Sequence, residues 1–276
     1  CWLEITSWPA TAIPCVRYNL KMRARILDRL KQIETEHSVK ILYACESGSR
    51  AWGFASQDSD YDVRFVYVRP RDWYLAVDLE RRRDVIELPI DDALDINGWD
   101  LRKALKLFHK SKPPVLEWLN SPTVYRQTPG FCEALNDLLP QYYSPSACAY
   151  HYLHMARGNF REYLQGDSVR LKKYLYVLRP LLAVLWIEQQ RGQAPTLFQA
   201  LVDAVATETG LRAAIDGLLA TKRGGLETAW GPSIPALGDF IERELNRLRY
   251  ANFKSDGASA SWQPLNELFR AYAVAD

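Results

Sequence analysis

The 276-residue chain lacks any apolar run long enough to cross a bilayer. The most apolar stretch lies between Leu181 and Ile187 and is flanked by Arg179 and Glu188, whereas a transmembrane helix needs about 20 apolar residues. A secretory signal is also missing, because residues 1–21 contain no continuous apolar region and hold two prolines. The sequence therefore predicts no membrane span.

The five cysteines are odd in number and form no Cys-x-x-Cys pair. This scarcity argues against a disulfide framework and a zinc ribbon, and it favours reduced thiols in a cytoplasmic protein. Cys45 lies in an apolar run with strand character, so we expect it to be buried and inert.

Neither sign of charge dominates, since 35 Lys and Arg residues face 33 Asp and Glu residues, for a formal net charge of +2. Composition alone therefore does not indicate a nucleic-acid binder, and any basic surface must come from local clustering. The chain is 48% hydrophobic and 25% charged, which is typical of a globular protein of one large or two modest domains.

Hydrophobic periodicity places most strands in the first part of the chain. An amphipathic helix is predicted over residues 22–37, strands over 40–45 and 61–68, and a hairpin of two strands over 84–90 and 93–97. After about Pro113 the strand pattern disappears and only helical patterns remain. We therefore predict an α+β fold in which a small mixed sheet with helices (22–112) precedes a helical domain (113–276). Residues 1–21, before Met22, are expected to be an extension.

A Gly-Ser turn and two aspartates carry the chemistry. Gly48-Ser49 follows the first predicted strand, and Asp60 and Asp62 enter the second. A Gly-Ser turn that opens a helix lets backbone N–H groups and a hydroxyl approach phosphates closely. Carboxylates two residues apart on a strand share one face, and their repulsion is relieved by divalent cations. Two such ions can activate a hydroxyl and stabilise leaving pyrophosphate.

This stretch resembles the nucleotidyltransferase signature of the DNA polymerase β superfamily: Gly-Ser, a spacer (here residues 50–59), then Asp-x-Asp. The resemblance implies that Ser49 binds nucleotide phosphates, that Asp60 and Asp62 ligate Mg²⁺ (or Mn²⁺), and that a third carboxylate comes from a later strand. Asp95 fits this place, because its apolar neighbours put its side chain on the opposite face from theirs. Three other carboxylates remain alternatives, namely Glu87, Asp92 and Asp100.

Three longer segments, residues 45–54, 95–105 and 172–182, are similar to bacterial and phage predicted nucleotidyltransferases named as an RNA-repair-pathway polymerase β family. The likeness extends over roughly residues 40–187. It implies transfer of a nucleotide to an RNA end.

Several basic side chains are further candidates. Arg50 is either a phosphate ligand or a salt-bridging residue. Arg64 shares the parity of the two aspartates and either contacts nucleotide or pairs with these acids, and pairing is the favoured alternative. Lys172, Tyr176 and Arg179 share one helix face, which either is solvated or reaches a triphosphate across a cleft. Lys173 competes for that contact.

The predicted function is metal-dependent transfer of a nucleoside monophosphate from an NTP to an acceptor. The acceptor is an RNA 3′ end, a protein hydroxyl or a small molecule such as an aminoglycoside. The predicted catalytic and metal-binding residues are Asp60, Asp62 and Asp95, and the predicted nucleotide-binding residues are Gly48, Ser49, Arg50, Lys172 and Tyr176. The alternative is an inactive nucleotide- or RNA-binding module such as a toxin–antitoxin partner. The carboxylates argue against it, because a binder of polyanions gains nothing from them. The sequence does not indicate an oligomeric state.

Overall fold

The structure is a computed structural model that describes residues 20–56, 58–224, 230–253 and 260–273. Most of the predicted extension, residues 1–19, lies outside the described residues. The first helix, α1 (Leu20–His37), begins two residues before the predicted start at Met22.

A five-stranded mixed sheet forms the centre of the first part of the chain, in the order β3-β4-β2-β1-β5. Its strands are β1 (Lys40–Glu46), β2 (Tyr61–Val68), β3 (Val85–Glu87), β4 (Leu94–Asp100) and β5 (Val124–Gln127). β2 runs parallel to β4, whereas every other pair is antiparallel. The predicted hairpin is confirmed, with β3 paired to β4 and Asp92 in its turn at a φ of 57°.

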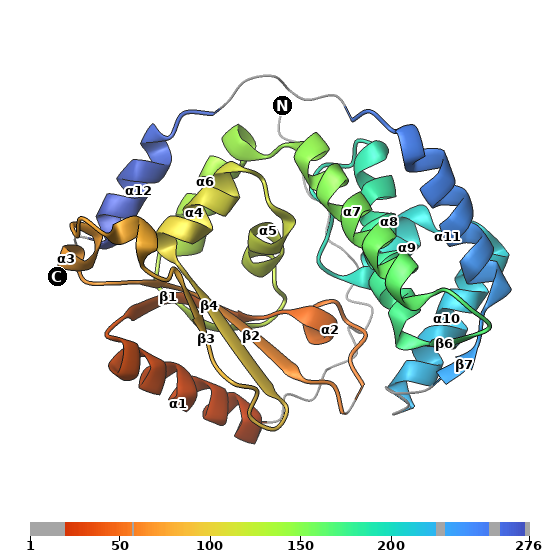
Figure 1. Ribbon diagram of the computed structural model, residues 1–276, viewed down its shortest axis with the longest axis horizontal. Coiled ribbons are helices and arrows are strands. Elements are labelled where there is room, and N and C mark those ends of the chain that lie inside the picture. The colour runs from red at the N-terminus through yellow and green to blue at the C-terminus, as the bar shows by residue number, and fades with distance from the viewer. Residues whose placement is uncertain (1–19, 57, 225–229, 254–259, 274–276) are drawn as a thin grey trace.

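Helices cover both faces of this sheet (Figure 1). α1 lies on one face, where its apolar stripe of Ile26, Leu30 and Ile33 packs in one cluster with the alternate β2 residues Val63 and Phe65. The other face meets α4 (Leu101–His109), α5 (Pro113–Leu119) and α6 (Phe131–Tyr142). Because strand side chains alternate, the residues of β2 that do not face α1 point toward these helices and the second part of the chain.

The expectation that no strand follows Pro113 is wrong. β5 pairs with β1 at the edge of the sheet, and a small ribbon joins β6 (Ser168–Arg170) to β7 (Trp230–Pro232). These strands have only three or four residues each, too few for an alternating pattern to stand out from a loop. The sheet therefore includes residues that the sequence assigned to the helical domain.

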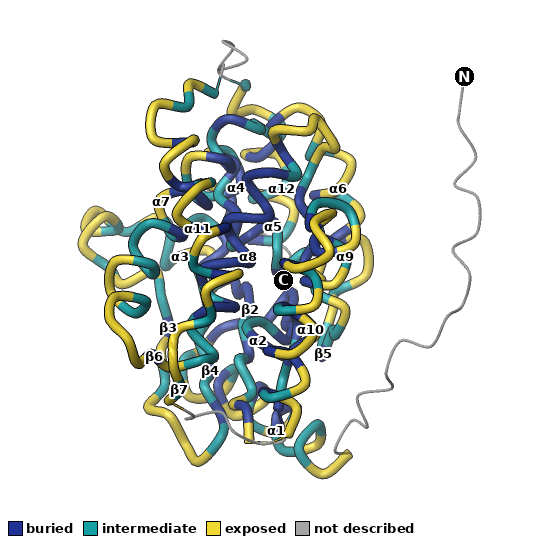
Figure 2. The backbone as a smooth tube through the Cα atoms, turned by 90° about the vertical axis from the view of Figure 1, so that its right-hand side faces the viewer, coloured by how far each residue is buried: buried dark blue, intermediate teal, exposed yellow. Residues whose placement is uncertain are grey.

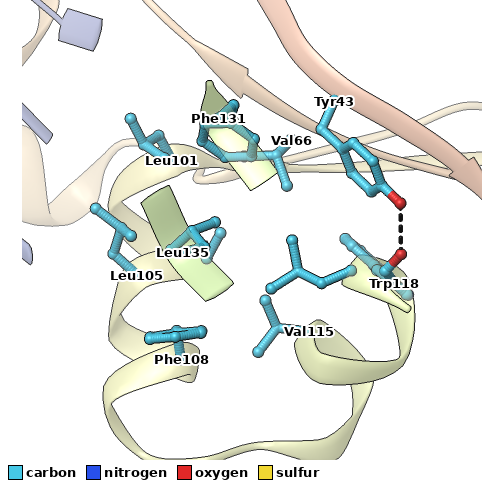
Figure 3. A pocket seen from close by; sticks show the side chains of 11 residues that line it. Tyr43, Val66, Leu101, Leu105, Phe108, Val115, Trp118, Phe131 and Leu135 are labelled. Carbon is cyan, nitrogen blue, oxygen red and sulfur yellow. Dashed lines mark hydrogen bonds between the residues drawn. The ribbon is translucent and has the colours of Figure 1, made fainter. Parts of the chain in front are cut away.

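Between the sheet and α4, α5 and α6 the packing is close to complete. The cavity here is about 10 Å³ and is lined by apolar side chains such as Val66, Leu105 and Phe131 (Figure 3). The Tyr43 hydroxyl donates to the backbone oxygen of Trp118 over 2.6 Å and ties β1 to α5. A space of this size is about that of one water, so it is a packing gap and not a ligand site.

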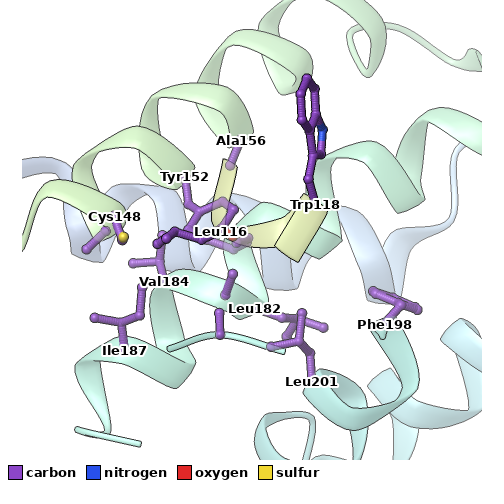
Figure 4. Close-up of a cluster of buried hydrophobic side chains, with 14 of the residues drawn as sticks. Leu116, Trp118, Cys148, Tyr152, Ala156, Leu182, Val184, Ile187, Phe198 and Leu201 are labelled. Carbon is purple, nitrogen blue, oxygen red and sulfur yellow. The ribbon is translucent and has the colours of Figure 1, made fainter. Parts of the chain in front are cut away.

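The remaining helices form a second group beside the sheet (Figure 1). They are α7 (Pro145–Tyr163), α8 (Lys172–Glu188), α9 (Phe198–Val205), α10 (Thr209–Arg223) and α11 (Pro235–Arg247). α8 is buried along most of its length and continues through Pro180. Its side chains Leu182, Val184 and Ile187 pack with Tyr152 of α7 and Leu116 of α5 (Figure 4).

One continuous apolar core joins the two groups, and its buried residues lie along the middle of the molecule (Figure 2). The last helix, α12 (Gln263–Ala273), returns to the first group, where Phe269 meets Tyr74 and Tyr272 meets Phe131 edge to face. The shorter helices are α2 (Gly48–Ala51), α3 (Arg71–Tyr74), η1 (Leu79–Arg81) and η2 (Leu248–Tyr250). Within the described ranges, no helix is long and apolar enough to span a membrane.

Candidate active site

The Gly-Ser turn lies directly against the second aspartate of the Asp-x-Asp pair. β1 ends at Glu46, and the Ser47 amide then donates to the Asp62 carbonyl over 2.8 Å. Gly48 opens α2 with a φ of +58°, and a Cβ on this residue would lie 1.9 Å from Asp62 Oδ2. Only glycine allows both this backbone conformation and this approach. Ser49 follows in the same turn and is buried.

Asp62 on β2 and Asp95 on β4 are direct partners in the parallel strand pair. Both carboxylates therefore lie on the sheet face that points away from α1, with about a quarter to a third of each side chain exposed. Asp60 is exposed just before β2 and shares this parity. Burial raises the pKa of the Asp62 carboxyl, and the negative charges of Asp95 and Asp60 raise it further against the opposing effect of Arg64. Asp60 and Asp95 thus both act on the carboxyl of Asp62.

The other carboxylates weighed for the third position have separate roles. Asp92 lies in the β3–β4 turn and forms an ion pair with Arg25, and Glu87 accepts from Asn97 on β4. Asp100 caps the N-terminus of α4, where it accepts from the Arg102 amide over 2.8 Å. Of Asp95 and its three alternatives, Asp95 is the one in register with Asp62. Its role as a metal ligand stays a prediction.

Arg64 pairs with both carboxylates, as its strand parity predicted. One guanidinium nitrogen lies 2.9 Å from Asp62 Oδ1 and 2.8 Å from Asp95 Oδ2, while the other donates to the Asp95 carbonyl over 3.0 Å. Arg64 is thus a fixed counter-ion between the two acids.

The donor set fits a hard divalent cation. Arg64 bonds one oxygen of each carboxylate, and carboxylate oxygens are the ligands that Mg²⁺ and Mn²⁺ prefer. However, the described residues include no set of three acidic, histidine or cysteine side chains already gathered as a metal site. Binding of Mg²⁺ by Asp60, Asp62 and Asp95 therefore stays a prediction, and it requires these side chains to draw closer together.

Glu46 is a functional candidate that the sequence analysis missed. Its carboxylate is buried, with Oε1 accepting from the Asp62 amide over 2.8 Å and Oε2 accepting from the Tyr125 hydroxyl of β5. Burial raises the pKa of Glu46 to about 7. Through its hydrogen bond to the Asp62 amide, the carboxylate fixes the backbone of Asp62. A charged residue at the end of the apolar run 40–45 was the available signal.

Arg50 is held by the loop that leads to Asp60. Its guanidinium lies 3.7 Å from the centroid of the Tyr61 ring and donates to the carbonyls of Ser59 over 2.5 Å and Asp60 over 3.0 Å. These contacts brace the loop. A further contact with nucleotide stays a prediction.

The three residues of the predicted basic helix face have different surroundings in the structure. Arg179 is 1% exposed and forms a buried ion pair with Glu117 of α5 over 2.8 Å, so the expectation that it could face a triphosphate is wrong. The buried stripe of α8 is wider than the leucine spacing suggested, and Glu117 of α5 is the ion-pair partner of Arg179. Tyr176 instead lies edge-on to Trp52, the residue that follows α2, at 5.8 Å. Lys172 is half-buried at the first position of α8.

Comparisons with known proteins show the family of this chain. The chain is similar to a solved nucleotidyltransferase-like protein from Exiguobacterium sibiricum 255-15, with 11% identity, a TM-score of 0.33, and coverage of 89% of this chain and 80% of the other. It is 50% identical over 230 residues to the uncharacterized protein YcgL of Bacillus subtilis (strain 168), which covers 83% of this chain and 88% of the relative. The family model described as RNA repair pathway DNA polymerase beta family matches residues 22–271, and the chain belongs to this family.

Proposed function

We propose that this protein is a metal-dependent nucleotidyltransferase that transfers a nucleoside monophosphate from an NTP to the end of an RNA. The observation that carries the proposal is the register of Asp62 with Asp95 on one sheet face, with Gly48 packed against the Asp62 carboxylate. This arrangement supports a site that holds cationic charge and triphosphate side by side. The family description supports RNA as the acceptor.

In the proposed reaction, Gly48 and Ser49 approach the triphosphate through the opening turn of α2, while Asp60, Asp62 and Asp95 hold Mg²⁺ or Mn²⁺. When bound by these three residues, the ion would supply positive charge to the phosphates and would make the acceptor hydroxyl more acidic. The acceptor oxygen forms a bond to the α-phosphorus, and the bond from that phosphorus to pyrophosphate breaks. The hydroxyl proton passes to a carboxylate of the site, a role that we assign to Asp95.

The test is to incubate the protein with each labelled NTP, Mg²⁺ and total RNA, with and without a chelator, and to measure the label transferred. Asp60→Asn, Asp62→Asn and Asp95→Asn should each lower transfer by at least about 10²-fold. Asp92→Asn is the matched control, because this exposed acid of the β3–β4 turn pairs only with Arg25 in the described structure. Near wild-type transfer in Asp62→Asn and Asp95→Asn would refute the proposal.

The Arg64 bridge favours a second candidate, a protein that binds nucleotide or RNA without transferring it. Arg64 already pairs with Asp62 and Asp95, so its positive charge partly offsets the two carboxylates without a metal ion. If this candidate holds, NTPs bind while no acceptor becomes labelled with any NTP, and binding does not depend on Mg²⁺.

A further inference from the structure

An exposed tryptophan and an arginine face each other on the β6–β7 ribbon. Arg170 and Trp230 are register partners, and the guanidinium carbon lies 5.3 Å from the centroid of the indole. Trp230 is 62% exposed, which is unusual for the largest apolar side chain. Among the described residues, Arg170 has no carboxylate partner in an ion pair. Both groups are thus available to a ligand.

A second group of the same kind lies at the junction of α7 and α8. Lys173 Nζ is 3.6 Å from the centroid of the Tyr163 ring and 5.2 Å from that of Tyr176. Tyr176 in turn meets Trp52, which directly follows the Gly-Ser helix α2. The two groups are neighbours along the chain, because Arg170 and Lys173 are three residues apart, and Tyr176 and Trp52 continue from the second group to the turn that approaches the Asp62 carboxylate.

Positive charge is concentrated along this path. The pKa of Lys173 is lowered by burial first and then by the charges of Lys172 and Arg170, against the opposing effect of Glu162. Residues 161–173 contain four basic and two acidic side chains, although the whole chain is nearly neutral. Such a local excess next to the exposed ring of Trp230 is the feature that sequence-independent binders of single strands use, with bases on rings and phosphates on cations.

We propose that Arg170, Trp230, Lys173, Tyr163 and Tyr176 form a cation–aromatic strip that binds the single-stranded end of an RNA acceptor. The inference rests on the proposed function, because the strip leads the RNA end toward the acids that act on it. Bases stack on Trp230, and backbone phosphates follow Arg170 and Lys173. The strip extends across β6, β7, α7 and α8, so it suits a polynucleotide and not a single NTP.

The test is fluorescence anisotropy with a labelled 12-nucleotide RNA and the full chain at low salt. Trp230→Ala and Arg170→Ala should each weaken binding about tenfold, and Arg170→Ala should also reduce the dependence of binding on salt. The matched controls are Tyr250→Ala and Arg249→Ala, because Arg249 lies 5.8 Å from the centroid of the 85%-exposed Tyr250 in a similar pair on η2. These controls should change binding less than about twofold.

Two outcomes would overturn the inference. One is wild-type RNA binding in both Trp230→Ala and Arg170→Ala, or an equal loss in the controls. The other is tighter binding of a fully paired RNA duplex, because paired bases cannot stack on Trp230.

A parallel measurement separates this inference from the proposed function. NTP binding in the presence of Mg²⁺ should be unchanged in Trp230→Ala, and RNA binding should be retained in Asp62→Asn. If RNA binding depends on the strip but no NTP is ever transferred, the proposed function fails and the binding surface stands. If transfer occurs and RNA binding ignores Trp230 and Arg170, the strip fails alone.

Discussion

Replacing Gly48 by alanine would bring a methyl group against the Asp62 carboxylate. The added Cβ would lie 1.9 Å from Asp62 Oδ2, whereas real Cβ atoms keep at least 3.0 Å from such atoms. The carboxylate therefore has to move by about 1 Å. Because a misplacement of about 1 Å in a catalytic site costs roughly 10²-fold in rate, we expect Gly48→Ala to lower nucleotide transfer about 100-fold or more.

The same substitution also strains the backbone, and this effect needs its own control. An alanine in the left-handed region costs about 1–2 kcal/mol of stability. Gly53 has a φ of +85°, but its added Cβ would meet only the end of the flexible Leu197 side chain, at 3.3 Å. Gly53→Ala thus carries a comparable backbone cost without displacing an acid, and both variants should lose about 1–2 kcal/mol.

Three measurements test this reasoning. Urea denaturation gives the free energy of unfolding of each variant, and transfer from a labelled NTP at saturating Mg²⁺ gives its activity. Calorimetric titration with Mg²⁺ or Mn²⁺ reports the displaced Asp62 independently of turnover, and it should show weaker binding only in Gly48→Ala. Equal losses of activity in the two variants, or full activity in Gly48→Ala, would show that Gly48 does not position Asp62.

Other features give further predictions. Breaking the buried pair by Glu117→Gln or Arg179→Met should lower the free energy of unfolding by about 3–5 kcal/mol, measured by urea denaturation, because it leaves an uncompensated buried charge. The buried thiols of Cys45 and Cys148 should not react with a thiol reagent at pH 8 until the protein unfolds, since burial raises both pKa values, that of Cys148 to about 11. Burial raises the pKa of Glu46 from 4.5 to about 7, so folding takes up a proton in this window and this contribution to stability declines as the pH rises through it. Glu46→Gln should therefore show a flatter stability profile between pH 5 and 8 in metal-free protein, and an unchanged profile would contradict the assignment.

The local parts of the site were predictable because each rests on a short-range pattern. β2 was predicted with the bounds that the structure has, since alternating β-branched and aromatic residues end at a proline. The strand face of Asp95 followed from its apolar neighbours Leu94 and Ile96, which pack on the α1 face, whereas its register with Asp62 is known only from the structure. Parity on a strand is thus enough to choose a face.

The missed features depend on partners that are distant in sequence. β5 is a strand only because β1 offers an edge about 80 residues earlier. Arg179 fits a solvated helix face by spacing, but Glu117 lies 62 residues away and stabilises it inside the core. Glu46 looked like the polar end of a strand until Tyr125 and the Asp62 amide were placed around it. Periodicity predicts on which face of a helix or strand a residue lies, but not which residues pack against that face.

The same long-range contacts decide how α2 is held. Helix α2 has a single turn, so its own backbone bonds cannot fix its position. The residue that ends it, Trp52, donates through Nε1 to Glu117 over 3.3 Å and accepts through its carbonyl from the Phe198 amide over 2.9 Å. Glu117 also accepts hydrogen bonds from Tyr152 and Arg179. Side chains or backbone of α5, α7, α8 and α9 are therefore linked by hydrogen bonds to the end of α2. The helical part of the chain therefore helps to fix the position of Gly48 relative to the Asp62 carboxylate. A sheet domain expressed without these helices would lose the hydrogen bonds that hold α2 in place.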